Sequence, residues 1–241
     1  ESHRPLPDVW IDGEAAAGSE CPEVGEVQIA EDETVSVSLR HAFARPLVFA
    51  SAALAAVVSD EPAEEVSTCS AATVRVSKVR KVEERWIFNL AMVPPSCAVG
   101  LGTKTCRWTV SWLAWTEKAG VTGRITSTDG RFVATEARIG AELEPMLFTT
   151  IQQYSDSDQT TDDDYNWLVP RSDGLTVRTA ESTHTGTENV VSFRLKYQRA
   201  EGTDSRFTSS ADIAWLLMPA GEGSFGSCAI SYEVGRLEDV D

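Results

Sequence analysis

Apolar and polar residues alternate with a period of two along most of the chain. Thr34–Leu39, Ala72–Val79 and Val190–Tyr197 all follow this pattern. Successive side chains of a β-strand point to opposite faces, so the pattern predicts strands with one buried face. Helical periodicity is hard to find, and Val, Thr, Ser, Gly and Pro are common. The sequence therefore predicts an all-β fold.

The strand patterns occur twice in the same order. Trp112 and Trp215 lie in matching apolar stretches, and Pro46–Phe49 matches Pro145–Phe148. Proline and tryptophan are 66 residues apart in the first copy and 70 in the second. Anchors repeated in order at nearly equal spacing indicate a duplicated module. We predict two tandem antiparallel β-sandwich modules, each with about six to seven strands.

The repeat divides the chain into four segments. These are an N-terminal arm (1–17), a first module (18–118), a second module (119–222) and a C-terminal strand (223–241). Within the second module, the polar stretch 152–166 is expected to be a loop. The apolar Trp167–Val169 follows it, and Leu175–Ala180 is expected to be a strand.

The tryptophan strands are apolar on both faces. Leu113 and Trp115 lie opposite the core-facing Trp112, and Leu216 and Met218 lie opposite Trp215. A strand with one face in water should be polar on that face. This second apolar face predicts either cover by another element of the same module or a contact between modules or molecules.

The two ends of the chain are candidates for assembly contacts. Cys228–Val234 alternates like a strand and is either the closing strand of module two or a strand donated to a neighbouring subunit, since an exposed edge invites pairing. The N-terminal arm has no core of its own. We predict an assembly interface of seven residues: Trp10, Ile11, Trp115, Met218, Ile230, Tyr232 and Val234.

Charge excludes several classes of partner. The formal net charge of −16 argues against nucleic acid and against anionic membrane surfaces, because both need Lys/Arg patches. The longest apolar run, Val48–Val58, is too short to cross a bilayer. We therefore expect no nucleic acid partner and no membrane insertion.

Five cysteines leave the redox state open. Cys97 and Cys106 flank a glycine-containing loop between two strand-like runs, which favours a disulfide closing that hairpin, with Cys69 as an alternative partner for either. Five buried reduced thiols are the other interpretation. No CxxC pair or Cys/His cluster is present, so a cysteine metal site is not predicted.

A cluster of acidic residues is the single metal candidate in the sequence. Several carboxylates in one loop could hold Ca²⁺ through oxygen ligands, although the spacing is not that of an EF-hand, and the alternative is a solvated acidic loop. The residues are Asp156, Asp158, Asp162, Asp163 and Asp164. No other cofactor is expected.

Catalytic motifs do not emerge from the sequence. It contains no GxSxG, HExxH or P-loop pattern, and His3, His41 and His184 have no evident nucleophile partner. The segment 221–226 matches GxGxxG formally, but a strand-like pattern follows it where a dinucleotide site needs a helix. We predict that the chain is not an enzyme.

The order of motifs resembles the H-type lectin and related small β-sandwich repeats of extracellular adhesion proteins. The resemblance rests on a P-h-h-F strand (h, apolar), a basic alternating strand, an F-x-L strand and a tryptophan strand. The clearer copy is Pro145–Phe148, Val177–Arg178, Phe193–Leu195 and Trp215–Gly221; the weaker one is Pro46–Phe49, Val74–Val76, Phe88–Leu90 and Trp112–Trp115. The resemblance implies a six-stranded antiparallel sandwich that oligomerises, with a sugar site between subunits.

These patterns favour a non-enzymatic, extracellular structural or adhesive protein that self-assembles as a homo-oligomer, filament or surface-layer subunit. The alternative is a carbohydrate-binding, H-type-like lectin. Its glycan would contact loops around Asp156–Asp164, with Tyr154 or Trp167 as aromatic platforms.

Overall fold

The computed structural model describes residues 21–30, 33–58, 73–93, 105–117, 121–140, 144–154, 168–182, 186–199, 210–225, 228 and 230–234. Within these ranges the chain forms β-strands and no helix, which confirms the all-β prediction. The strands are β1 (Glu23–Ala30), β2 (Thr34–Ser38), β3 (Pro46–Val58), β4 (Thr73–Val82), β5 (Arg85–Val93), β6 (Thr105–Thr116), β7 (Thr122–Thr128), β8 (Val133–Gly140), β9 (Pro145–Tyr154), β10 (Leu168–Ser182), β11 (Gly186–Arg199), β12 (Ser210–Pro219), β13 (Gly221–Ser224) and β14 (Ser231–Val234).

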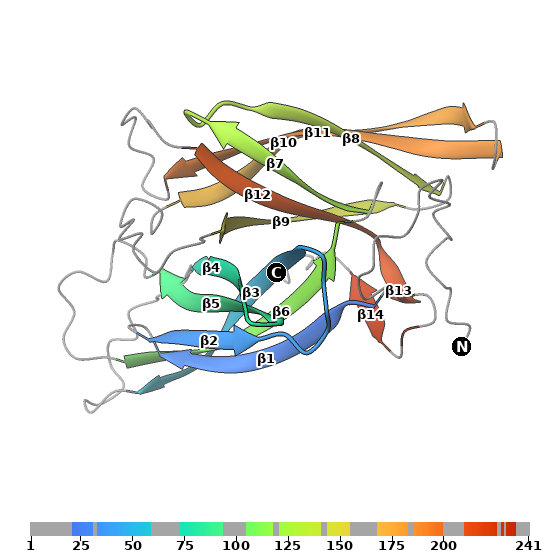
Figure 1. Cartoon of the computed structure of the whole chain (residues 1–241). Helices are drawn as coiled ribbons and strands as arrows, with labels where there is room; N and C mark the ends of the chain where they lie inside the picture. The colour runs from blue at the N-terminus through green and yellow to red at the C-terminus, as the bar shows by residue number, and fades with distance from the viewer. Residues whose placement is uncertain are drawn as a thin grey trace.

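The same strand order occurs in both halves of the chain. The first half contributes β1-β6-β3 and β2-β5-β4, and the second half contributes β7-β12-β9 and β8-β11-β10. Each strand of the first half therefore corresponds to the strand six places later in the second. We interpret each half as two facing three-stranded sheets, stacked as layers in Figure 1.

Strand register repeats together with strand order. Pro46 pairs with Thr116, four residues after Trp112. Pro145 pairs with Pro219, four residues after Trp215. The proline and tryptophan anchors thus occupy the same positions in both copies.

Both tryptophans lie against a glycine of the neighbouring strand. Gly25 of β1 pairs with Trp112, and Gly123 of β7 pairs with Trp215. A Cβ atom on either glycine would come within 3.0 Å of three atoms of the indole ring. The indoles also meet a phenylalanine edge-on, with 5.4 Å between ring centroids for both Phe88–Trp112 and Phe193–Trp215. Only glycine leaves room for the tryptophan in this arrangement.

One six-stranded sheet, β2-β5-β4-β9-β12-β7, joins the two halves. Its central pair, β4 and β9, is parallel and brings Val76 opposite Gln152. The Gln152 side chain is buried and reaches the edge of β3. It accepts a hydrogen bond from the Val48 N–H at 3.0 Å and donates one to the Pro46 carbonyl at 2.9 Å. A side-chain amide therefore pairs with this part of the β3 edge as a strand would.

Two strand predictions in the second half were wrong in extent. β9 continues to Tyr154, so Gln152 lies inside a strand and not in the expected loop. β10 extends beyond the expected Leu175–Ala180 at both ends, from Leu168 to Ser182, with a bulge between Asp173 and Thr176. Gly174 lies in this bulge with φ +67°, a conformation that glycine adopts without strain.

The C-terminal segment forms a short hairpin. β14 pairs with β13 of its own chain and with no other described strand. Gly223 pairs with Tyr232, and a Cβ on this glycine would meet the Tyr232 ring. The hairpin lies beside the ends of β1 and β6 (Figure 1). It therefore repeats the glycine–aromatic pairing of the two halves.

Candidate functional site

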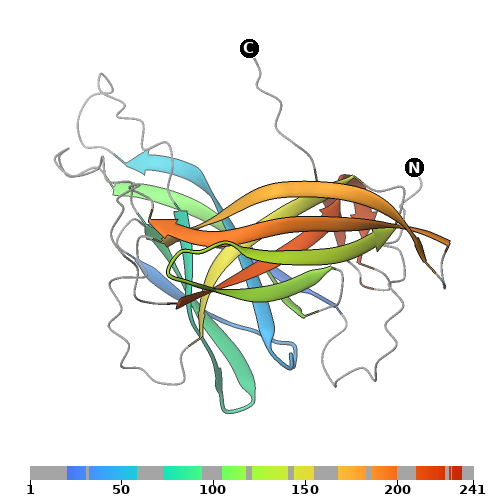
Figure 2. The same cartoon turned by 90° about the horizontal axis from the view of Figure 1, so that it is seen from above.

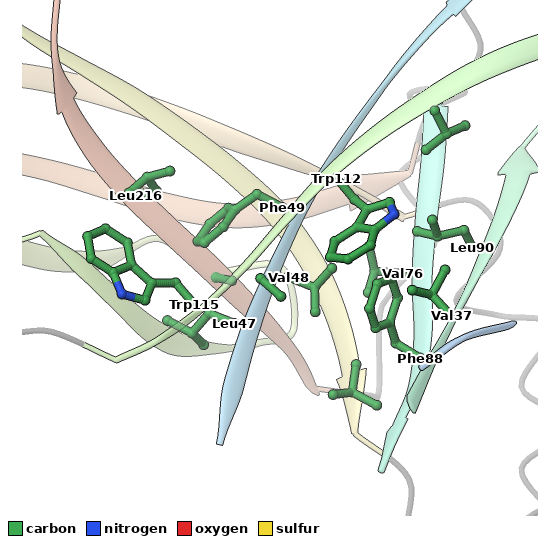
Figure 3. Close-up of a cluster of buried hydrophobic side chains, with 14 of the residues drawn as sticks. Val37, Leu47, Val48, Phe49, Val76, Phe88, Leu90, Trp112, Trp115 and Leu216 are labelled. Atoms are coloured by element: carbon green, nitrogen blue, oxygen red, sulfur yellow. The ribbon is translucent and has the colours of Figure 1, made fainter. Parts of the chain in front are cut away.

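Three of the residues predicted to form an assembly interface are buried inside the chain. Trp115 is 3% exposed, Met218 is 6% exposed and Val234 is 7% exposed. All three belong to one hydrophobic cluster that also contains Leu216 of β12 and Phe49 of β3. Figure 3 shows Leu216 beside Phe49 and Trp115. Of the expected alternatives for the apolar faces, a contact between the two halves is the one observed.

Ile230 and Tyr232 are partly buried against the same cluster. Phe225 links the hairpin to the first half, with ring centroids 5.0 Å from Trp115 and 5.2 Å from Tyr232. Burial raises the pKa of the Tyr232 phenol above its ordinary value of 10.0, because desolvation disfavours the phenolate. These side chains complete a core and present little surface to a partner.

A disulfide joins Cys21 to Cys228, 207 residues apart in the sequence. Sequence spacing held no signal for it, because the pairing follows from the hairpin folding back beside β1. The predicted Cys97–Cys106 bond involves Cys97, which lies outside the described residues, and the Cys106 side chain, which is not described. That bond stays a prediction.

Replacing both Cys21 and Cys228 by serine should lower the free energy of unfolding by about 2–4 kcal/mol, since the bond restricts the unfolded chain. Urea unfolding measures the loss. Each single replacement should cost as much as the double one, because either removes the same bond. Additive losses would contradict the pairing.

Several other candidates cannot be placed. Trp10, Ile11, Trp167 and the five aspartates between Asp156 and Asp164 lie outside the described ranges, and Tyr154 ends β9 with its side chain undescribed. Among the residues that are described, no group of three or more His, Cys, Asp or Glu side chains could hold a metal ion. The calcium and sugar sites therefore stay predictions.

The edge of β3 is the first surface that the structure offers to a partner. β3 is 13 residues long, carries no charged residue and pairs with β6 alone among the described strands. Gln152 covers its beginning, at Pro46 and Val48. Further along, Ser51, Ala53 and Ala55 are exposed. From Phe49 onward this edge lacks the charges and prolines that usually discourage edge pairing.

The outer face of the β8-β11-β10 sheet is the second such surface. This sheet is the uppermost layer in Figure 1 and faces the viewer in Figure 2. Its register places seven described charged side chains on one face. They are Arg138, Arg171, Arg178, Arg194, Lys196, Glu136 and Asp173.

The two carboxylates described on this face, those of Glu136 and Asp173, contact arginines. Arg178 lies 3.5 Å from Glu136, and Arg194 pairs with Asp173. Both pairs are about half exposed or more, where ion pairs contribute little to stability. Among the side chains that the structure describes on this face, five cations are accompanied by two anions, in a chain of net charge −16. The sequence showed Arg178, Arg194 and Lys196 on polar strand faces, but only the sheet order brings them together.

No helix within the described ranges is long and apolar enough to cross a membrane. Comparisons with protein-family models, curated proteins and solved structures find no match for this chain.

Proposed function

We propose that this chain is a non-enzymatic, extracellular structural or adhesive protein whose copies self-assemble by pairing their β3 edges. The observation that carries the proposal is the uncharged, 13-residue edge strand β3. A long, apolar edge strand is a template for pairing with another chain. Main-chain hydrogen bonds between added strands supply the affinity.

The geometry supports a symmetric contact. Antiparallel pairing of β3 with β3 of a second copy is related by a two-fold axis, the commonest symmetry of oligomers. It would join two β1-β6-β3 sheets into one six-stranded sheet. The segment from Phe49 onward is the one that pairs, because Gln152 already bonds to Val48 and Pro46.

The disulfide supports an extracellular setting. Disulfides persist in oxidising compartments and are rare where thiols are kept reduced. Cys21–Cys228 ties the start of β1 to the C-terminal hairpin, which keeps the buried Trp115 cluster covered.

Ala53→Lys tests the proposal, because Ala53 is exposed on β3 and a lysine there blocks edge pairing. Thr128→Lys is the matched control, with the same charge change at an exposed residue of the edge strand β7. Sedimentation velocity over a range of concentrations should show dimers or larger particles for the wild type and for Thr128→Lys, and monomers for Ala53→Lys. A monomeric wild type, or an Ala53→Lys variant that assembles normally, would refute the proposal.

A further inference from the structure

The outer face of the β8-β11-β10 sheet places like charges opposite one another. Arg171 of β10 pairs directly with Lys196 of β11. Val190 of β11 lies between Arg178 on one side and Arg138 on the other. Like charges directly opposite across strands cost roughly 0.2–1 kcal/mol, and opposite charges would contribute a similar amount. The direct Arg171–Lys196 pair is therefore unfavourable for the folded chain alone and becomes favourable where an anion is bound.

The flanking arginines do more than carry charge. Val190 is 3% exposed although it lies on the outer face and belongs to neither hydrophobic core cluster. The register places the aliphatic stems of Arg138 and Arg178 on both sides of it, where they can cover it while the guanidinium groups reach water. Stems in this position have less freedom than those of isolated surface arginines, and side chains that are already restricted lose less entropy when a ligand binds.

An aromatic ring holds the cations at the other end of the face. Lys196 Nζ lies 4.8 Å from the centroid of the Phe132 ring, and Arg194 Cζ lies 5.1 Å from it. Both distances are within the range of cation–π attraction. Phe132 itself is 36% exposed. The ring therefore orients two cations and offers an apolar surface beside them.

The spacing of the cations suits an extended ligand. Lys196 and Val190 are six residues apart on β11, about 20 Å at the rise of an antiparallel strand. Arg171 and Lys196 mark one end of this length, and Arg138 and Arg178 mark the other. A single small anion cannot reach both ends. Guanidinium groups bind planar and tetrahedral oxyanions through paired hydrogen bonds.

We propose that this face binds a linear acidic polysaccharide, whose sulfate or carboxylate groups contact the two pairs of cations. Charge complementarity carries the assignment: a protein of net charge −16 is repelled by polyanions except where cations gather, and they gather here. The Phe132 ring favours a sugar backbone, which can lay C–H groups against it. The site is independent of β3 pairing, so either proposal can fail without the other.

The test uses dextran sulfate as the probe and uncharged dextran, with the same sugar backbone, as the reference. Binding to the full chain is measured by titration calorimetry at several salt concentrations. We expect dextran sulfate to bind and dextran not to bind, with the logarithm of the association constant falling linearly as the logarithm of the salt concentration rises. Failure of dextran sulfate to bind at physiological salt would overturn the proposal.

A pair of double variants locates the site. Arg171→Gln with Lys196→Gln removes one cation pair from the face, and Lys81→Gln with Arg85→Gln removes two exposed cations from the β4–β5 hairpin. The first should weaken dextran sulfate binding by about tenfold or more and reduce the salt slope by about one to two. The second should change binding less than twofold. Equal weakening by both would show diffuse attraction without a site.

Poly-L-glutamate separates the polysaccharide from an acidic protein partner, including a second copy of this chain. The proposal predicts weaker binding to polyglutamate than to dextran sulfate of matched charge. Equal or tighter binding to polyglutamate would overturn the assignment to a polysaccharide.

Discussion

Gln152→Met is expected to destabilise the chain more than any other single polar substitution in its described part. Methionine keeps the volume of the side chain but leaves the Val48 N–H and the Pro46 carbonyl without their bonds to Gln152. An unsatisfied buried backbone group costs roughly 1–3 kcal/mol, so the two together should lower the free energy of unfolding by about 2–6 kcal/mol. Urea unfolding followed by circular dichroism measures the change.

Gln28→Met is the matched control for this effect. Gln28 also bonds through its side chain, to Thr109 at 2.6 Å, but it is exposed and water can replace the bond. Its replacement should change the free energy of unfolding by less than about 0.5 kcal/mol. If the two variants unfold alike, Gln152 does not join the halves in the way described.

Trp112→Ala and Trp215→Ala should each lower the free energy of unfolding by about 3–5 kcal/mol, because each removes a large buried ring and leaves a cavity. The two losses should be similar, since both rings meet a glycine and a phenylalanine in the same geometry. Thermal and urea unfolding of the two variants test this.

Glycine variants test whether the close contact between the Trp112 ring and Gly25 affects the free energy of unfolding. Gly25→Ala should cost about 1–3 kcal/mol in the wild type, because the new methyl group overlaps the Trp112 ring. In the Trp112→Ala background the same change should cost much less, and the neighbouring exposed Val24→Ala should cost little in either. A Gly25→Ala cost that does not depend on Trp112 would contradict the close contact.

Local pattern was sufficient to predict the repeat. Pro46 and Pro145 open strands whose register relative to Trp112 and Trp215 is the same, and the spacing of these anchors along the sequence reflects that register. Alternation also identified the core face of β11, where Phe193 and Leu195 are fully buried. Such features depend on residues within one strand or within two paired strands, so they can be recognised in the sequence.

Features that depend on distant strands were not predictable. The polar pattern predicts a loop at Gln152, whereas the structure buries this residue against the edge of β3. The sequence predicts Trp115 and Met218 at an assembly interface, whereas the structure buries both in one hydrophobic cluster of the chain. Alternation of apolar and polar residues indicates which face of a strand is apolar, but it does not indicate which part of the molecule covers that face. The Cys21–Cys228 bond was missed for the same reason.

The order of strands in the β8-β11-β10 sheet also produces a charged outer face that is not evident in the sequence. Arg171 and Lys196 are distant in sequence, and a net charge of −16 gives no hint of a basic surface. Net charge is a sum over the whole chain, whereas binding depends on the charged side chains that lie together on one face. The linear sequence shows no cluster of Lys and Arg here, and the pairing of β11 with β10 and β8 is what brings these residues onto one face.

Hydrogen–deuterium exchange at low and high protein concentration tests most directly which surface assembles. If copies pair through β3, amides within Phe49–Val58 gain protection as particles form, while those of Ile230–Val234 do not change because the hairpin stays within its own chain. Protection gained at Ile230–Val234 with none at Phe49–Val58 would contradict the account and indicate strand donation from the C-terminal end.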